Sequence, residues 1–265
     1  MDWNDAYTNA KYIPSAADFP PRWRAEAAEF RVRLGERARI GLCYGADPRQ
    51  AFDLFMPQGA PLGMMVFIHG GFWRAFDRGD WSHLAAGALA RGWAVAMPGY
   101  RLAPVARISE MTREIAVAVV AAAQAVGGDL PIVATGHSAG GHLSARLACR
   151  DVVLPVSGRI RRVVPISPLS DLRPMMLTTM NDDFCLTEAE ARAESPMLLE
   201  RQADIGAHVW VGGAERPAFL DQARWLSDAW ACPLSVAEGR HHFDVIDALC
   251  DPSSALMDVL LAADG

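Results

Sequence analysis

One serine stands between glycines where an apolar stretch gives way to an alanine-rich one. The stretch VATGHSAGGHLSARLA contains G-x-S-x-G at Gly136 to Gly140, with Ser138 at its centre. Glycines on both sides let the backbone turn sharply because they carry no Cβ. A hydroxyl at the start of a helix lies where free amides and the helix dipole favour negative charge. The pattern is typical of a serine nucleophile at a strand-to-helix turn; the alternative is a serine that only caps the helix.

A second feature supplies the groups that a nucleophilic serine needs for acyl transfer. The stretch FIHGGFWR ends an earlier apolar run, and two glycines there let the backbone approach a substrate closely. Attack on an acyl carbon creates an oxyanion, which backbone N–H groups stabilise. We expect the amides of Gly70 or Gly71, together with that of Ala139, to form this oxyanion hole. We interpret His69 as a structural hydrogen-bonding residue.

The candidate general base comes from the end of the chain. Of seven histidines, His241 and His242 alone lie after the last expected strand, in EGRHHFDVID. This agrees with the chain order of nucleophile, acid and histidine in hydrolases with such a turn. We choose His242, which precedes an expected helix, and expect His241 to face solvent or to support the site. The other histidines are expected to pack or hydrogen-bond locally or carry no signal: His137, His142, His83 and His208.

The carboxylate that orients the base has two candidates. Glu215 follows the apolar run HVWVGGA, just before an expected helix. Its role would be to hold one imidazole tautomer and to stabilise the imidazolium. Asp171 follows the run RVVPISPLS and is the rival, because the end of that strand can also reach the histidine. Asp204 and Asp247 are poorer candidates, on an expected loop and an expected helix surface.

Apolar runs alternate with longer helical patterns and predict an α/β fold. Strands that are apolar throughout and separated by helices indicate a mostly parallel sheet covered on both faces. Residues 39–45 and 50–57, separated by ADPR, predict an antiparallel pair at one edge. We expect one domain over residues 1–265, with an N-terminal arm at about 1–38 and a lid segment at about 173–202. Expected strands cover 64–71, 93–100, 131–138, 162–171, 207–215 and 232–238; expected helices cover 80–92, 109–128, 139–150, 217–230 and 244–263.

Charge and composition argue against several classes of protein. The 265 residues carry 25 basic and 31 acidic side chains without long runs, for a formal charge of −6, so a non-specific nucleic-acid surface is not expected. The longest apolar stretch, 115–126, is too short to span a bilayer, and the N-terminus shows no apolar leader. Five scattered cysteines without CxxC spacing indicate free thiols in a reducing cytoplasm. Without HExxH or similar spacing, we expect no metal and no cofactor.

These motifs together resemble the α/β-hydrolase superfamily and, within it, the serine-dependent kynurenine formamidase (arylformamidase) group. The resemblance rests on HGGFW, GHSAGGHL, VGGAERPAFLDQ and HHFDVID, together with the opening YG…FDLFMP, and spans roughly Tyr44 to Asp247. G-x-S-x-G is common across the superfamily, whereas HGGFW combined with HHFDVID is much more specific. One departure is that relatives of this kind often carry aspartate where this chain has Glu215.

The resemblance implies hydrolysis of an N-formyl aryl amide, with Ser138 as nucleophile, His242 as base and Glu215 as acid. Phe72, Trp73 and Phe243 flank the implied catalytic loops and would bind a flat substrate. Tyr12 and Phe19 belong to an arm that could cover the site. Two alternatives stay open: a short-chain carboxylesterase with the same machinery, and a non-catalytic hydrolase-fold protein that binds an aromatic ligand. The expected partner is a small aromatic amide or ester, and the sequence leaves a homodimer open.

Overall fold

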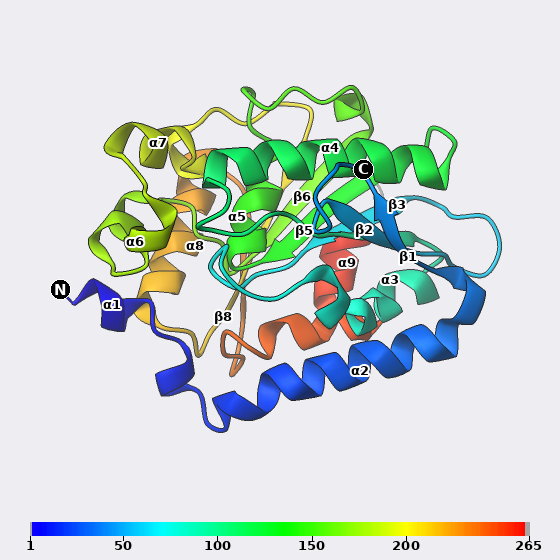
Figure 1. Ribbon diagram of the computed structural model, residues 1–265, viewed down its shortest axis with the longest axis horizontal. Helices are drawn as coiled ribbons and strands as arrows, with labels where there is room; N and C mark the ends of the chain where they lie inside the picture. Colours follow the sequence, from blue (N-terminus) through cyan, green and yellow to red (C-terminus); the bar gives the residue numbers. More distant parts are fainter. Residues whose placement is uncertain (1, 263–265) are drawn as a thin grey trace.

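A mixed β-sheet forms the centre of the protein (Figure 1). The computed structural model describes residues 2–262, so Met1 of the expected arm and the last three residues, 263–265, lie outside the described part. Within residues 2–262 the sheet has nine strands, ordered β1-β2-β4-β3-β5-β6-β8-β9, with β7 beside β6. The strands are β1 (Ala38–Cys43), β2 (Ala51–Phe55), β3 (Met64–Ile68), β4 (Ala94–Pro98), β5 (Ile132–His137), β6 (Ile160–Ile166), β7 (Gly206–Ala207), β8 (Val209–Gly212) and β9 (Leu234–Ala237).

Strand directions follow the sequence-based prediction. β2 pairs antiparallel with both β1 and β4. All the other neighbouring strands, from β4 through β3, β5, β6 and β8 to β9, and β7 beside β6, pair in parallel. Parallel strands bring their carboxyl ends to one edge of the sheet, where the connecting loops gather. The predicted antiparallel edge pair and the mostly parallel centre are both confirmed.

Helices cover both faces of the sheet, which explains why its central strands are apolar throughout. Side chains of β3 alternate between two cores: Met64, Val66 and Ile68 pack into one, and Met65 and Phe67 into the other. Residues of α4, α5 and α8 belong to the first core, and residues of α2, α3 and α9 to the second (Figure 1). The helices are α1 (Trp3–Ala6), α2 (Phe19–Leu34), α3 (Ala86–Ala90), α4 (Ile108–Val126), α5 (Ala139–Arg146), α6 (Asn181–Phe184), α7 (Glu188–Ala193), α8 (Pro217–Trp230) and α9 (Ala255–Leu261).

Two expected helices are interrupted in the structure, and the helix expected over 139–150 ends at Arg146. The helix expected over 80–92 consists of 3₁₀ turns followed by α3, where a Cβ on Gly87 would lie 2.5 Å from the carbonyl oxygen of Leu249. The helix expected over 244–263 is interrupted after the 3₁₀ turn Val245–Cys250. Pro252 follows this turn, and Ser254 then caps α9 by accepting a hydrogen bond from the Met257 amide.

Residues 2–37 precede the first strand. They form α1, two 3₁₀ turns (Ala10–Tyr12 and Ala16–Asp18), the long helix α2 and a third turn, Gly35–Arg37. Figure 1 shows α1 close to α6 and α8, and α2 running below the sheet. The segment 173–202 forms two 3₁₀ turns, Arg173–Leu177 and Pro196–Leu198, around α6 and α7. Among residues 2–262, no helix has both the length and the apolarity to cross a membrane.

Candidate active site

Ser138 lies at a sharp turn between β5 and α5. Its φ is 58° and its ψ is −117°, a backbone conformation that few residues with a Cβ adopt. The amide of Ser138 donates to the carbonyl oxygen of Ile166 on β6 (2.9 Å), which holds the turn against the sheet. A Cβ on Gly140 would collide with the backbone of Ile68, and one on Gly136 would collide with that of Gly140. Both glycines are therefore required by close backbone packing as well as by the turn.

The loop after β3 packs directly against this turn. A Cβ on Gly70 would lie 2.7 Å from the carbonyl oxygen of His137 and 3.2 Å from the Cβ of Ser138. Gly71 has φ +109°, where a side chain would be strained. Within residues 2–262, no hydrogen bond occupies the amides of Gly70, Gly71 or Ala139. The two loops thus place three unpartnered N–H groups near the serine, as an oxyanion hole requires.

His242 and Glu215 form a buried pair. Nδ1 of His242 lies 2.5 Å from Oε2 of Glu215, and the two side chains are 4% and 0% exposed. The other carboxylate oxygen accepts hydrogen bonds from the Gly212 amide (2.9 Å) and from the Ser167 hydroxyl. Glu215 sits between β8 and α8, so the end of a parallel strand positions the carboxylate. With Nδ1 engaged, Nε2 is the ring nitrogen left to face a hydroxyl.

Asp171 does not contact His242. Its carboxylate is bound instead by the guanidinium of Arg173, with Nη2 of the arginine 2.7 Å from Oδ2. The backbone amide of Asp171 donates to the Oε1 of Gln222 (2.7 Å), which keeps this segment in place. Of the two carboxylates that the sequence left open, the structure brings Glu215 to the histidine and keeps Asp171 away from it.

Three other buried histidines lie close to the turn. The Nδ1 of His69 lies 2.8 Å from the carbonyl oxygen of Gly70, and the Nε2 of His142 lies 2.7 Å from that of Glu194. Burial lowers the pKa of His69 to about 4 and that of His142 to about 3. Burial, with a smaller contribution from the neighbouring His242, also holds the pKa of His137 well below its usual range. The lowered pKa values favour the neutral form of all three rings.

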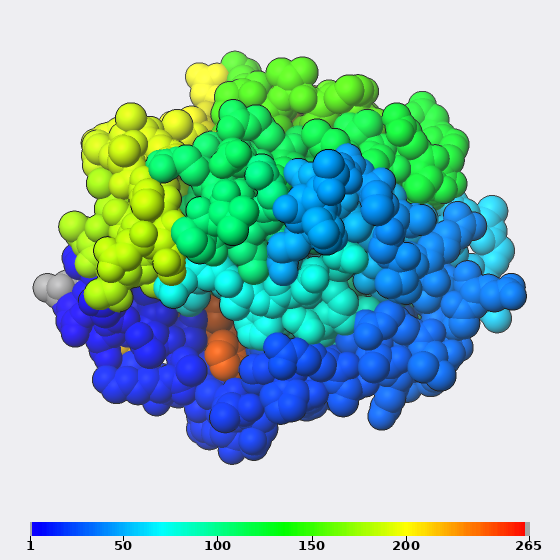
Figure 2. Space-filling model, viewed as in Figure 1, coloured from blue at the N-terminus to red at the C-terminus, as the bar shows by residue number. Residues whose placement is uncertain are grey.

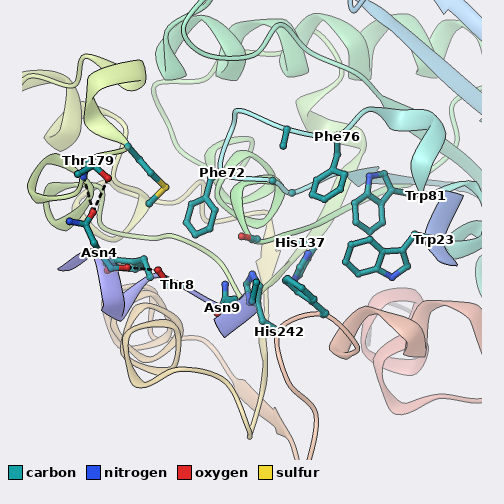
Figure 3. A pocket seen from close by; sticks show the side chains of 18 residues that line it. Asn4, Thr8, Asn9, Trp23, Phe72, Phe76, Trp81, His137, Thr179 and His242 are labelled. Carbon is teal, nitrogen blue, oxygen red and sulfur yellow. Dashed lines mark hydrogen bonds between the residues drawn. The ribbon is translucent and has the colours of Figure 1, made fainter. Parts of the chain in front are cut away.

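A cavity of about 400 Å³, called the main cavity below, opens onto Ser138 and His242 (Figure 3). None of the 18 residues that line it is Asp, Glu, Lys or Arg. The N-terminal arm forms one wall through residues between Asn4 and Trp23, and Thr179 and Met180 of the expected lid segment also reach it. Figure 2 shows a hollow between the blue N-terminal segment and the cyan and yellow segments, with orange C-terminal residues at its base. Among residues 2–262, no group of three or more His, Cys, Asp or Glu side chains could hold a metal ion.

Aromatic side chains give the main cavity an apolar wall. Trp23 packs against Trp81 with ring centroids 4.7 Å apart, and against Phe243 at 5.5 Å. Phe72 and Phe243, two of the residues expected to bind substrate, line the cavity. Trp73, the third, differs. Its side chain does not line the wall, because the ring is fully buried and packs edge-on against His142 and Phe184 in the core.

The arm covers the cavity through residues other than those expected. Tyr12 is 45% exposed and lies outside the main cavity, while Phe19 packs behind the wall against Phe243. Tyr7 and Asn9 line the cavity instead, and Tyr7 accepts a hydrogen bond from Gln222 (2.8 Å). The sequence carries no local signal for these residues, because Tyr7 bonds to Gln222 and Asn9 shares the cavity with His242, both more than two hundred positions away.

Ser167 is a further residue that the sequence did not single out. It follows β6 with φ 47°, and its hydroxyl contacts Glu215 as described above. The signal for Ser167 in the sequence is its position at the end of a parallel strand. The end of this strand suggested Asp171 as the acid, but the residue it contributes to the site is the hydroxyl of Ser167.

Comparisons with known proteins agree with this geometry. The sequence profile of the alpha/beta hydrolase fold matches residues 65–230, more than half of the chain. The kynurenine formamidase of Danio rerio is 25% identical over 248 residues, covering 89% of this chain and 85% of that protein. A crystal structure of a Silicibacter sp. protein suggested to be a thioesterase is 56% identical, with a TM-score of 0.96, and covers 99% of this chain and 100% of the other.

More distant structures share the fold alone. Esterase B from Lactobacillus rhamnosis is 20% identical, with a TM-score of 0.64 and coverage of 87% of each chain. The resemblance to hydrolases found in the sequence is therefore confirmed at the level of the family. The chain belongs to the alpha/beta hydrolase fold family.

Proposed function

We propose that the protein is a serine hydrolase that removes a small acyl or formyl group from an aromatic amide or ester, with N-formylkynurenine as the first candidate substrate. The observation that carries the proposal is the 2.5 Å contact between His242 Nδ1 and Glu215 Oε2 beside the cavity that Ser138 also lines. A histidine oriented by a buried carboxylate, in one cavity with a serine at a sharp strand-to-helix turn, is the arrangement of a nucleophile and its base.

In the proposed mechanism, Ser138 attacks the acyl carbon while His242 takes the hydroxyl proton. The amides of Gly70 or Gly71 and of Ala139 hold the oxyanion, and Glu215 stabilises the imidazolium. Protonated His242 then donates its proton to the leaving nitrogen or oxygen. Water activated by His242 releases the acyl group and restores the serine.

Relatives and the cavity wall support a formamidase. The fish relative carries the name kynurenine formamidase, and the aromatic wall around Trp23, Trp81 and Phe243 offers stacking surface for an aryl leaving group. Each aromatic contact is worth about 0.5–1.5 kcal/mol beyond the area it buries.

A short-chain carboxylesterase is the second candidate, and the absence of charged side chains in the cavity lining favours it. N-formylkynurenine carries an ammonium and a carboxylate, whereas no residue lining the main cavity within 2–262 has a formal charge to pair with them. A neutral aryl or alkyl ester would enter without that desolvation cost.

A substrate panel on purified protein tests the proposal. It would compare N-formylkynurenine, p-nitrophenyl acetate and an S-acyl thioester, the last because of the activity suggested for the Silicibacter relative. Efficient hydrolysis of N-formylkynurenine supports the formamidase; ester hydrolysis with an inert formamide supports the carboxylesterase.

Labelling with a fluorophosphonate tests the serine mechanism independently of the natural substrate. We expect one label on wild-type protein and none on Ser138→Ala. An unlabelled protein that binds aromatic ligands without hydrolysing any member of the panel would contradict the enzyme and favour the non-catalytic binder.

A further inference from the structure

Asn9 is a buried polar side chain without a partner. It is 6% exposed, and among the described residues neither its Oδ1 nor its Nδ2 has a hydrogen-bond partner. A carboxamide buried in this way costs free energy, because it loses its water without gaining a protein hydrogen bond. Such a group at the wall of a cavity is suited to a polar atom of a ligand.

The neighbouring polar residues of the arm are already engaged. Asn4 accepts hydrogen bonds from the amide and hydroxyl of Thr179 (2.8 and 3.1 Å). The Thr8 hydroxyl donates to the carbonyl oxygen of Asn4 (2.6 Å), and Tyr7 accepts from Gln222. Asn9 is therefore distinct from the polar residues around it, since its amide group is not used to hold the arm in place.

The position of Asn9 relates it to the leaving group. It lines the main cavity with Ser138 and His242, and it also lines a second cavity with His242 and Glu215. Figure 3 shows the side chain of Asn9 directly beside that of His242. In the mechanism proposed above, His242 delivers the proton to the departing atom, which would place Asn9 on the leaving-group side of the site.

The chemistry of amides and esters differs at that departing atom. When the serine oxygen bonds to the acyl carbon, the carbonyl electron pair moves to the oxyanion. The amide nitrogen then takes a proton from His242 on its lone pair, and the C–N bond breaks to release an amine. Throughout these steps an anilide keeps an N–H that needs an acceptor, whereas an ester oxygen carries no hydrogen.

We propose that the carboxamide oxygen of Asn9 accepts a hydrogen bond from the N–H of the scissile amide and so makes the enzyme selective for aryl amides over aryl esters. The proposal rests on the hydrolase function proposed above. A carboxamide has an acceptor at one end and a donor at the other, and a half-turn about Cβ–Cγ exchanges them. The residue would therefore touch the substrate at the reacting nitrogen and set its specificity.

A matched pair of substrates tests the proposal. 4-Nitroacetanilide and 4-nitrophenyl acetate share the acyl group and the ring and differ only in N–H against O. We expect Asn9→Leu to lower kcat/KM for the anilide by about 10- to 100-fold and to change that for the ester by less than about threefold. Lys11→Ala is the control, because Lys11 is an exposed arm residue outside the main cavity. It should change kcat/KM for both substrates by less than about twofold.

Stability provides a second readout. Asn9→Leu should keep or raise the melting temperature, because no hydrogen bond is lost and an unpartnered polar group is removed. Asn9→Ala serves as the second variant because it adds no volume. Failure of both variants to fold would show that the side chain is structural and would overturn the proposal.

The outcomes separate this proposal from the proposed function. Equal losses on both substrates, or no loss on either, overturn the role of Asn9 and leave the serine hydrolase in place. A wild-type enzyme that hydrolyses the ester but not the anilide also overturns the role of Asn9 and leaves the serine hydrolase in place. A wild-type protein that hydrolyses neither and takes no fluorophosphonate label overturns both.

Discussion

The turn around Ser138 and the N-terminal arm form two walls of one cavity, but they are held in different ways. At the turn, glycine backbones of β5 and α5 pack directly on the backbone of β3. The arm is held by side chains, through Asn4 to Thr179 and Tyr7 to Gln222. Backbone packing tolerates almost no change, whereas individual side-chain contacts can be exchanged. We therefore expect substitutions at the turn to have much larger effects than substitutions in the arm.

The largest effect is expected from Ser138→Ala. Loss of the nucleophile should lower kcat by about 10⁴- to 10⁶-fold on whichever substrate is hydrolysed best. The control is Ser144→Ala on α5, whose buried hydroxyl donates to the carbonyl oxygen of Gly141 and lies outside the cavity lining. Steady-state kinetics on both variants give the comparison. Full activity in Ser138→Ala would mean that the chemistry lies elsewhere.

Glu215→Gln should have the next largest effect. The amide can no longer stabilise the imidazolium and favours the wrong tautomer of His242, so kcat should fall by about 10²- to 10⁴-fold. Asp171→Asn is the matched control, because its carboxylate pairs with Arg173 and does not reach the histidine. We expect the kcat of this variant to stay within about threefold of the wild-type value. The reverse ranking would assign the orienting role to Asp171.

Gly140→Ala tests the packing of the turn through stability. The added Cβ would collide with the backbone of Ile68, so the free energy of unfolding should fall by about 1–3 kcal/mol or more. Gly158→Ala is the control, since a Cβ there meets no atom within 4 Å, and its effect should be below about 0.5 kcal/mol. Urea titrations measure both variants. Equal stabilities would show that β3 can shift to accommodate the methyl group.

The buried histidines near the turn predict loss of stability in acid. The pKa of His142 falls to about 3 in the folded protein, below its usual value of 6.5 in the unfolded chain. Between these values only the unfolded chain takes up the proton. The stabilisation that comes from the depressed pKa of His142 is therefore fully present above pH 6.5 and declines as the pH falls. The slope per histidine is about 1.4 kcal/mol per pH unit. His142→Gln should therefore show a shallower loss than wild type in urea titrations between pH 6 and 5; parallel curves would contradict the prediction.

The smallest effect is expected in the arm. Asn4→Ala removes the two hydrogen bonds to Thr179, which are exposed, so the free energy of unfolding should fall by no more than about 1 kcal/mol. Limited proteolysis of the first ten residues should be faster in this variant. A loss as large as that of Gly140→Ala would remove the distinction between the two walls.

The same contrast explains what could be predicted from the sequence. The mostly parallel sheet with its antiparallel edge pair, the turn at Ser138 and the choice of His242 follow from local motifs and from the ends of parallel strands. The choice between Glu215 and Asp171 as the partner of His242 needed the structure. Trp73 was wrong as a cavity residue because its ring packs in the core against His142 and Phe184, which lie far from it along the chain. Tyr7 and Asn9 could not be found because their positions depend on contacts with the other end of the chain.

The bond between Tyr7 and Gln222 also bears on how the molecule is assembled during synthesis. The arm leaves the ribosome early, yet its buried partner follows 215 residues later. Helix α2 can pack on residues 78–85 soon after they emerge, whereas Tyr7 must wait for its partner until α8 has emerged and folded. The main cavity gains its last wall only near the end of translation, so a nascent chain has the turn at Ser138 before it has an enclosed place for a substrate.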